Sequence, residues 1–158
     1  MKSFALTTLV TACLLAAPAL AMDDATKAAL QDCQTSDTTA AKGVEACTKV
    51  LNGVKMGPQS QTAIYYYRGA FFLGTKNNEK AKSDFAQAIE TYEKDSGKAD
   101  WQPNFVGLVA SSYAFRGQIE LAAKDCPSAK ADFGKAATTE REVSQREQYE
   151  AMARNACK

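Results

Sequence analysis

The stretch that decides the fold is Tyr65-x-x-Arg68-Gly69, followed by Ala81-x-x-x-Phe85-x-x-Ala88. It recurs 48 positions later as Tyr113-x-x-Arg116-Gly117, followed by Ala129-x-x-x-Phe133-x-x-Ala136. In both copies the first alanine lies twelve positions after the glycine. Because an internal repeat sets the architecture of a whole domain, this one predicts an array of paired helices. It does not indicate which partner the array holds.

Almost every segment after Asp23 has helical character. Ala, Lys, Glu, Gln and Leu dominate, and no run of alternating β-branched residues competes with them. The expected helices cover about 24–34, 39–51, 59–74, 77–94, 105–123, 126–137 and 139–157. A capping box, Thr139-x-x-Glu142, is expected to open the last one. The sequence therefore predicts an all-α fold, with one sizeable loop between Asp95 and Asn104.

Residues 1–21 have the pattern of a signal peptide. Lys2 precedes an apolar stretch, and Ala19-Leu20-Ala21 is an A-x-A cleavage site. An alternative is that Val10-Thr11-Ala12-Cys13 forms a lipobox, which would leave Cys13 acylated. The apolar stretch continues past Cys13 to Leu20, which favours simple cleavage after Ala21. We therefore expect export, with no membrane insertion of the mature chain.

The mature chain, residues 22–158, has the size of one domain and almost no net charge. Removal of Lys2 lowers the basic count from 19 to 18, against 18 acidic residues, and the two signs are interspersed. Nucleic-acid and anionic-membrane binding need clustered excess Lys and Arg. The composition therefore argues against both.

Four cysteines remain after cleavage: Cys33, Cys47, Cys126 and Cys157. An even number of cysteines in an exported chain indicates disulfides, and four allow three connectivities.

The repeated motif resembles the tetratricopeptide repeat (TPR) family. That family carries aromatic and small residues on a first helix, then Ala-x-x-x-Phe and a further Ala on a second. The matching positions here are Tyr65, Gly69, Phe72, Ala81, Phe85 and Ala88, then Tyr113, Gly117, Ala129, Phe133 and Ala136. The resemblance implies a short right-handed solenoid with units at about 24–52, 59–94 and 104–137 and a capping helix at about 139–157.

The chain departs from the family pattern in several ways. Arg68 and Arg116 stand where leucine is usual, and Glu120 replaces the second aromatic residue. The copies are 48 residues apart, against about 34 in the family, so the extra residues should lie between Asp95 and Ser112. The repeat is therefore divergent.

A degenerate unit upstream completes the resemblance. Ala46-Cys47-Thr48 aligns with Asp84-Phe85-Ala86, and with Cys33 it is similar to small exported TPR proteins of Gram-negative bacteria. In such helix hairpins Cys33 would face Cys47, and Cys126 would face Cys157. These are the two expected disulfides, each worth about 3 kcal/mol in the loop-entropy model.

Catalysis has little support in the sequence. The chain has no histidine, which excludes histidine triads and histidine metal sites. It also lacks a glycine-rich phosphate loop and a metal-ligand cluster of convincing spacing. Several carboxylates occur at helical spacing near lysines and are expected to form ion pairs on solvated faces: Asp84, Glu90, Glu93, Asp125 and Asp132. We expect no enzyme, no cofactor and no metal.

Tyr66 is the most tempting binding residue. In the TPR family its face of the helix, shared with Ala70 and Leu73, lines the concave groove; the counterpart face in the next unit carries Ala114, Gln118 and Leu121. Arg68 and Arg116 could stand at the rim of this groove. Alternatively, Tyr66 only packs on the preceding helix.

Trp101 is the second candidate, and it has two interpretations: a plug that covers the core from the long loop, or an exposed anchor for a partner.

These observations together predict a non-catalytic periplasmic TPR-type module that binds an unidentified peptide or protein segment in its groove. The alternative is a structural or assembly subunit of an envelope complex, anchored by lipid at Cys13. The two differ in whether a groove or all exposed faces make the interface.

Overall fold

The computed structural model describes residues 23–35, 37–95 and 97–158 and shows an all-α protein, as the sequence predicts. The leader and Cys13 lie outside the described residues. The helices are α1 (Asp24–Gln34), α2 (Ala40–Gly53), α3 (Pro58–Gly74), α4 (Asn78–Lys94), α5 (Pro103–Ala122), α6 (Cys126–Thr139) and α7 (Val143–Asn155). A 3-10 turn, Lys98–Asp100, precedes α5, and the described part of the chain contains no strand.

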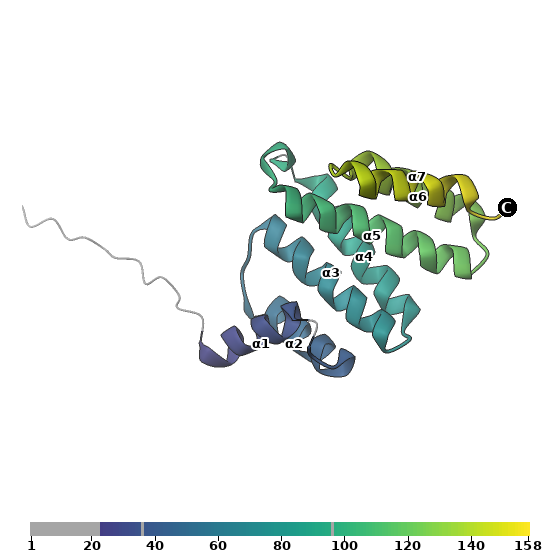
Figure 1. The fold of residues 1–158 in the computed structure, drawn as a ribbon. Helices are drawn as coiled ribbons and strands as arrows, with labels where there is room; N and C mark the ends of the chain where they lie inside the picture. Colours follow the sequence, from purple (N-terminus) through teal and green to yellow (C-terminus); the bar gives the residue numbers. More distant parts are fainter. Residues whose placement is uncertain (1–22, 36, 96) are drawn as a thin grey trace, which may run out of the picture.

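Consecutive helices pack as antiparallel hairpins: α1 with α2, α3 with α4, and α5 with α6. The α1–α2 hairpin lies at one end of the molecule and α6 with α7 at the other (Figure 1). Between them α3 contacts both α2 and α5, and α5 contacts α4. The second and third hairpins, which carry the two copies of the repeated motif, therefore form the middle of the molecule.

Short polar side chains cap the starts of four of these helices. The residues Asp23, Thr39, Asn77 and Asp125 each accept a hydrogen bond from a backbone N–H in the first turn of the following helix. The predicted capping box at Thr139 is wrong, because α6 continues through Thr139. The carboxylate of Glu142 caps α7 instead, since it accepts the N–H groups of Ser144 and Gln145.

The turns after α3 and α5 have the same conformation. Lys76 has φ 58° and Lys124, 48 positions later, has φ 63°. In each turn the next residue donates its N–H to the carbonyl five residues back, Asn77 to Phe72 and Asp125 to Glu120. This left-handed helix ending favours glycine, and lysine adopts it here in both copies.

Glycine and phenylalanine make the close approach inside each repeated hairpin. Phe85 and Phe133 are buried, and a Cβ placed on Gly69 would meet the Phe85 ring at 2.8 Å. A Cβ on Gly117 would meet the Phe133 ring at 3.0 Å. The four motif alanines, Ala81, Ala88, Ala129 and Ala136, are fully buried. Tyr113 is buried as well, whereas Tyr65 and Phe72 are only half-buried. The motif thus forms the contact between the two helices of each hairpin.

Two disulfides join helices near the two ends of the array. Cys33 on α1 is bonded to Cys47 on α2, with a Cα–Cα distance of 4.8 Å. Cys126, the first residue of α6, is bonded to Cys157, just after α7, with a Cα–Cα distance of 5.8 Å. These are the two pairs that the hairpin arrangement predicts.

Candidate functional site

Each repeated hairpin contains an ion pair between its two helices. In the first copy the guanidinium of Arg68 on α3 donates to both carboxylate oxygens of Asp84 on α4, from Nε at 2.7 Å and from Nη2 at 2.8 Å. In the second copy Arg116 on α5 contacts Asp132 on α6 in the same way, at 2.6 and 2.7 Å. Such bidentate contacts are geometrically specific. The same Arg–Asp ion pair, here called the lock, therefore joins the two helices of both hairpins: Arg68–Asp84 and Arg116–Asp132.

These pairs correct two expectations. Asp84 and Asp132 do not lie on solvated faces, since their residues are only 4% and 6% exposed. Arg68 and Arg116, which were expected at the rim of the concave groove, direct their guanidinium groups into their hairpins to reach these carboxylates. The hydrogen bonds that the guanidinium groups donate to these aspartates raise the pKa of both arginines further above its ordinary value.

The two pairs differ in what the preceding helix supplies. Arg68 donates from Nη1 to the Thr48 hydroxyl of α2 at 3.2 Å. Beside Arg116 the preceding helix, α4, presents Ala86, and within the described residues no protein acceptor binds Nη1 of Arg116. A hollow of about 710 Å³ opens there; it is lined by Ala86, Ile89, Glu90, Glu93, Lys94, Tyr113, Arg116, Ala131, Asp132 and Lys135.

Charge inside this hollow is largely paired. Glu93 accepts a hydrogen bond from the Tyr113 hydroxyl at 2.5 Å, and Lys94 pairs with Glu90. Burial, followed by this bond to Glu93, raises the pKa of Tyr113 well above its ordinary value, so its hydroxyl remains a donor. The hollow is therefore polar and nearly balanced in charge, with no excess of either sign to attract an ion.

Tyr66 contributes to packing between helices. Its ring lies 6.2 Å from the ring of Phe85 on α4 and 6.1 Å from that of Phe115 on α5, and these two phenylalanines stack on each other at 5.4 Å. Burial raises the pKa of the Tyr66 hydroxyl. Tyr66 thus packs against aromatic rings of the next two helices.

The other residues expected in the groove vary in exposure. Ala70 and Leu73 are half-buried, Gln118 is exposed, and Leu121 is 36% exposed. This face offers one large exposed apolar side chain, which is little for an anchor on its own.

Trp101 is not an exposed anchor. Only 2% of the residue is exposed, its ring lies edge-on to that of Tyr92 at 4.8 Å, and its indole N–H donates to Asp95 at 2.6 Å. The bond to Trp101 also lowers the pKa of Asp95. The loop therefore places this indole over the core as a plug, the first of the two interpretations. A buried indole needs apolar neighbours for its ring and a hydrogen-bond acceptor for its N–H, and both are present here.

An apolar hollow of about 240 Å³ lies between α1, α2, α3 and the start of α5. Apolar side chains dominate its wall, with Gln34 and Ser60 as the polar members. The full lining is Leu30, Gln34, Val50, Val54, Met56, Ser60, Ala63, Ile64 and Phe105. Ile64 and Val50 are buried and form its floor, while Val54, Met56 and Phe105 are partly exposed around it. Of the described surfaces, this one is best suited to hold an apolar side chain.

Sequence reasoning missed this hollow because its residues come from four helices and a connection. The available signal was Val54 and Met56, two apolar residues just beyond the breaker Asn52-Gly53, where a solvated turn would be polar. Knowing that they share a wall with Phe105 requires the tertiary structure.

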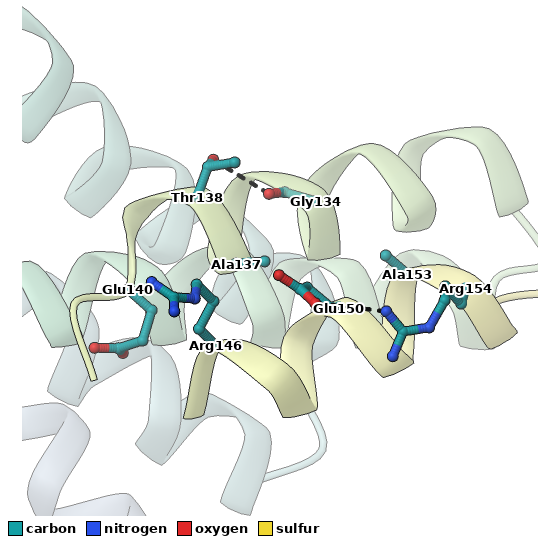
Figure 2. A pocket seen from close by; sticks show the side chains of 8 residues that line it. All are labelled: Gly134, Ala137, Thr138, Glu140, Arg146, Glu150, Ala153 and Arg154. Carbon is teal, nitrogen blue, oxygen red and sulfur yellow. Dashed lines mark hydrogen bonds and ion pairs between the residues drawn. The ribbon is translucent and has the colours of Figure 1, made fainter. Parts of the chain in front are cut away.

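A third depression runs between α6 and α7 (Figure 2). It has a volume of about 500 Å³, and small residues form its base: Gly134, Ala137 and Ala153. Arg146, Glu150 and Arg154 project from α7, and Arg154 pairs with Glu150. The depression therefore follows the seam between two packed helices, with small side chains on both of them and charged side chains of α7 beside it.

Within residues 23–35, 37–95 and 97–158, no group of three or more His, Cys, Asp or Glu side chains could hold a metal ion. The helices described there are also too short or too polar to cross a membrane. No family model, curated protein or solved structure matches the chain. Any functional conclusion must therefore come from the site itself.

Proposed function

We propose that this protein is a non-catalytic interaction module of the TPR type that binds a peptide or protein segment through an apolar side chain. The observation that carries the proposal is the hollow between α1 and Phe105. Its volume of about 240 Å³ lies below the roughly 300–1,000 Å³ of small-molecule sites. It suits one large apolar side chain of a longer ligand, whose remaining residues would lie across the neighbouring helices.

The TPR assignment is supported by the repeated hairpin. Both copies join a glycine on one helix to a phenylalanine on the next, as the motif requires for close helix approach. A binding role also agrees with the absence of histidine from the sequence and with the pairing of all four described cysteines, which leaves no free thiol nucleophile among them.

We further propose that the protein is exported to the periplasm of a Gram-negative bacterium. The leader pattern of residues 1–21 supports this, and two disulfides are stable in an oxidising compartment. The positions of the disulfides fit such a module, because terminal hairpins of an array have one neighbour and fray first.

The test is a selection of random peptides displayed on phage against the mature oxidised protein. Selected peptides should share one large apolar residue. Their binding, measured by isothermal titration calorimetry, should be abolished by a Val54→Glu, Met56→Glu variant, because two carboxylates would then line an apolar wall.

Two matched controls locate the interface. Leu121→Glu alters the exposed apolar residue of α5, and Val143→Glu alters one on α7 that is 54% exposed. Neither should change the affinity. Loss of binding in Leu121→Glu alone would move the interface to the face of Tyr66 and Leu73. If no peptide is enriched, the groove-binding proposal is wrong and the assembly-subunit alternative takes its place.

A further inference from the structure

The two disulfides lie in very different surroundings. Cys33 and Cys47 are 0% exposed and belong to the core cluster that also contains Ala29, Val50 and Ile64. Cys157 is exposed, and its partner Cys126 is half-buried at the start of α6. Because thiol–disulfide exchange requires in-line access of a thiolate to a sulfur, the Cys126–Cys157 bond is open to attack and the Cys33–Cys47 bond is shielded.

Helix α7 has little else to hold it. Tyr149 is its one buried residue, and Met152 packs beside it against the core. The Tyr149 hydroxyl lies 3.3 Å from that of Ser111 on α5. On the side facing α6, an open depression of about 500 Å³ replaces large apolar contacts, since the lining residues there are small or charged (Figure 2). A helix of 13 residues is marginal in water on its own.

We propose that Cys126–Cys157 is a redox clip whose reduction releases α7 while the rest of the fold is retained. In the step, a thiolate of a dithiol reductant attacks the exposed sulfur of Cys157 and forms a mixed disulfide, and Cys126 leaves as a thiolate. The second thiol of the reductant then displaces Cys157. Two electrons pass to the protein, both cysteines end as thiols, and the reductant becomes a disulfide.

Release of α7 uncovers a defined surface. Tyr149 is the one member of its core cluster that comes from α7; the cluster also contains Val109, Ala110, Ala136 and Ala137 on α5 and α6. Ser111 loses the partner hydroxyl of Tyr149 at the same time. The reduced protein therefore presents an apolar patch that the oxidised protein covers, far in the fold from the hollow at α1. The inference does not depend on the proposed peptide binding.

The test combines differential alkylation with hydrogen exchange, both read by mass spectrometry. The oxidised protein is titrated with dithiothreitol, free thiols are trapped with iodoacetamide, and amide exchange is followed in parallel. We expect Cys126 and Cys157 to be alkylated at lower dithiothreitol than Cys33 and Cys47. Amides of α7 should then exchange about tenfold faster or more, while those of α3 and α4 keep their rates.

A Cys126→Ser, Cys157→Ser variant separates the clip from reagent effects, since it should show the same fast exchange in α7 without dithiothreitol. The proposal is overturned if all four cysteines are alkylated at the same reductant concentration. It is equally overturned if α7 keeps its protection in the reduced protein and in this variant, or if the whole chain loses protection with it.

Discussion

The α3–α4 and α5–α6 hairpins are built alike inside, and they differ in what the neighbouring helices supply. Both contain an Arg–Asp lock, a glycine against a phenylalanine, and a turn with lysine at positive φ. Before the first hairpin α2 supplies Thr48, which takes the third donor of Arg68. Before the second, α4 supplies Ala86, and a hollow opens beside Arg116. The contacts that both hairpins share stabilise the fold. The side chain that the preceding helix supplies determines whether a hollow forms beside the arginine.

The largest difference between the copies is expected at the packing phenylalanines. Phe85→Ala should lower the free energy of unfolding by about 4 kcal/mol and Phe133→Ala by about 3 kcal/mol. Phe85 loses more because its ring also contacts those of Tyr66 and Phe115. Urea unfolding of the oxidised variants, followed by circular dichroism, measures both values.

A Phe115→Ala background provides the control, because it removes the stacking partner of Phe85 alone. In that background the difference between the two losses should shrink, with the contact between Phe85 and Tyr66 remaining. A larger loss at Phe133 in the parent would contradict the comparison.

The second-largest effects are expected when the Arg–Asp locks are broken. Asp84→Ala and Asp132→Ala should each cost about 2–3 kcal/mol, since each leaves a partly buried guanidinium without its carboxylate. The loss should be smaller for Asp132, because water can reach Arg116 from the neighbouring hollow. Thermal and urea unfolding are the measurements.

Replacement of the whole second lock, by Arg116→Met with Asp132→Leu, should be nearly neutral, because it removes both charges together. If Asp132→Ala lowered the free energy of unfolding as much as Asp84→Ala, the idea that water in the hollow solvates Arg116 would be wrong.

A third pair of variants exchanges the feature that distinguishes the copies. Thr48→Ala should cost about 1 kcal/mol, the loss of one hydrogen bond to a charged donor. Ala86→Thr should add up to about 0.5 kcal/mol by offering Nη1 of Arg116 a hydroxyl. Ala86→Val is the isosteric control for the second change and should give no such gain; equal effects of threonine and valine would exclude the hydroxyl as the cause.

The smallest effects are expected at the two turns, and there the copies should agree. Lys76→Gly and Lys124→Gly should each raise the free energy of unfolding by about 0.5–1 kcal/mol, because glycine adopts positive φ without steric cost. Lys76→Ala and Lys124→Ala keep the steric cost and should leave stability almost unchanged. Melting temperatures measured side by side would reveal any inequality between the two turns.

The helices, the repeat and the disulfide pairs could be predicted because each has a local signal. Asn77 and Asp125 predict helix starts, and the spacing of Gly69 and Phe85 predicts a hairpin. The locks were missed because Asp84 looks like any helix-surface acid until Arg68, 16 residues earlier, is seen to face it. The start of α7 was misplaced because two carboxylates, Glu140 and Glu142, compete with Thr139 for the cap. Long-range contacts of this kind are set by tertiary packing, which no local pattern encodes.

The shared lock also bears on how the chain avoids pairing with the wrong helix. Arg68 would fit Asp132 as well as Asp84, so the ion pair fixes the register of a hairpin without choosing its members. The short turn makes that choice. With only Thr75, Lys76 and Asn77 between the two helices, α3 forms its hairpin with α4 rather than with a helix further along the chain. Lengthening this turn would make the two locks interchangeable, within one molecule or between two, and an exchanged dimer would then compete with the monomer.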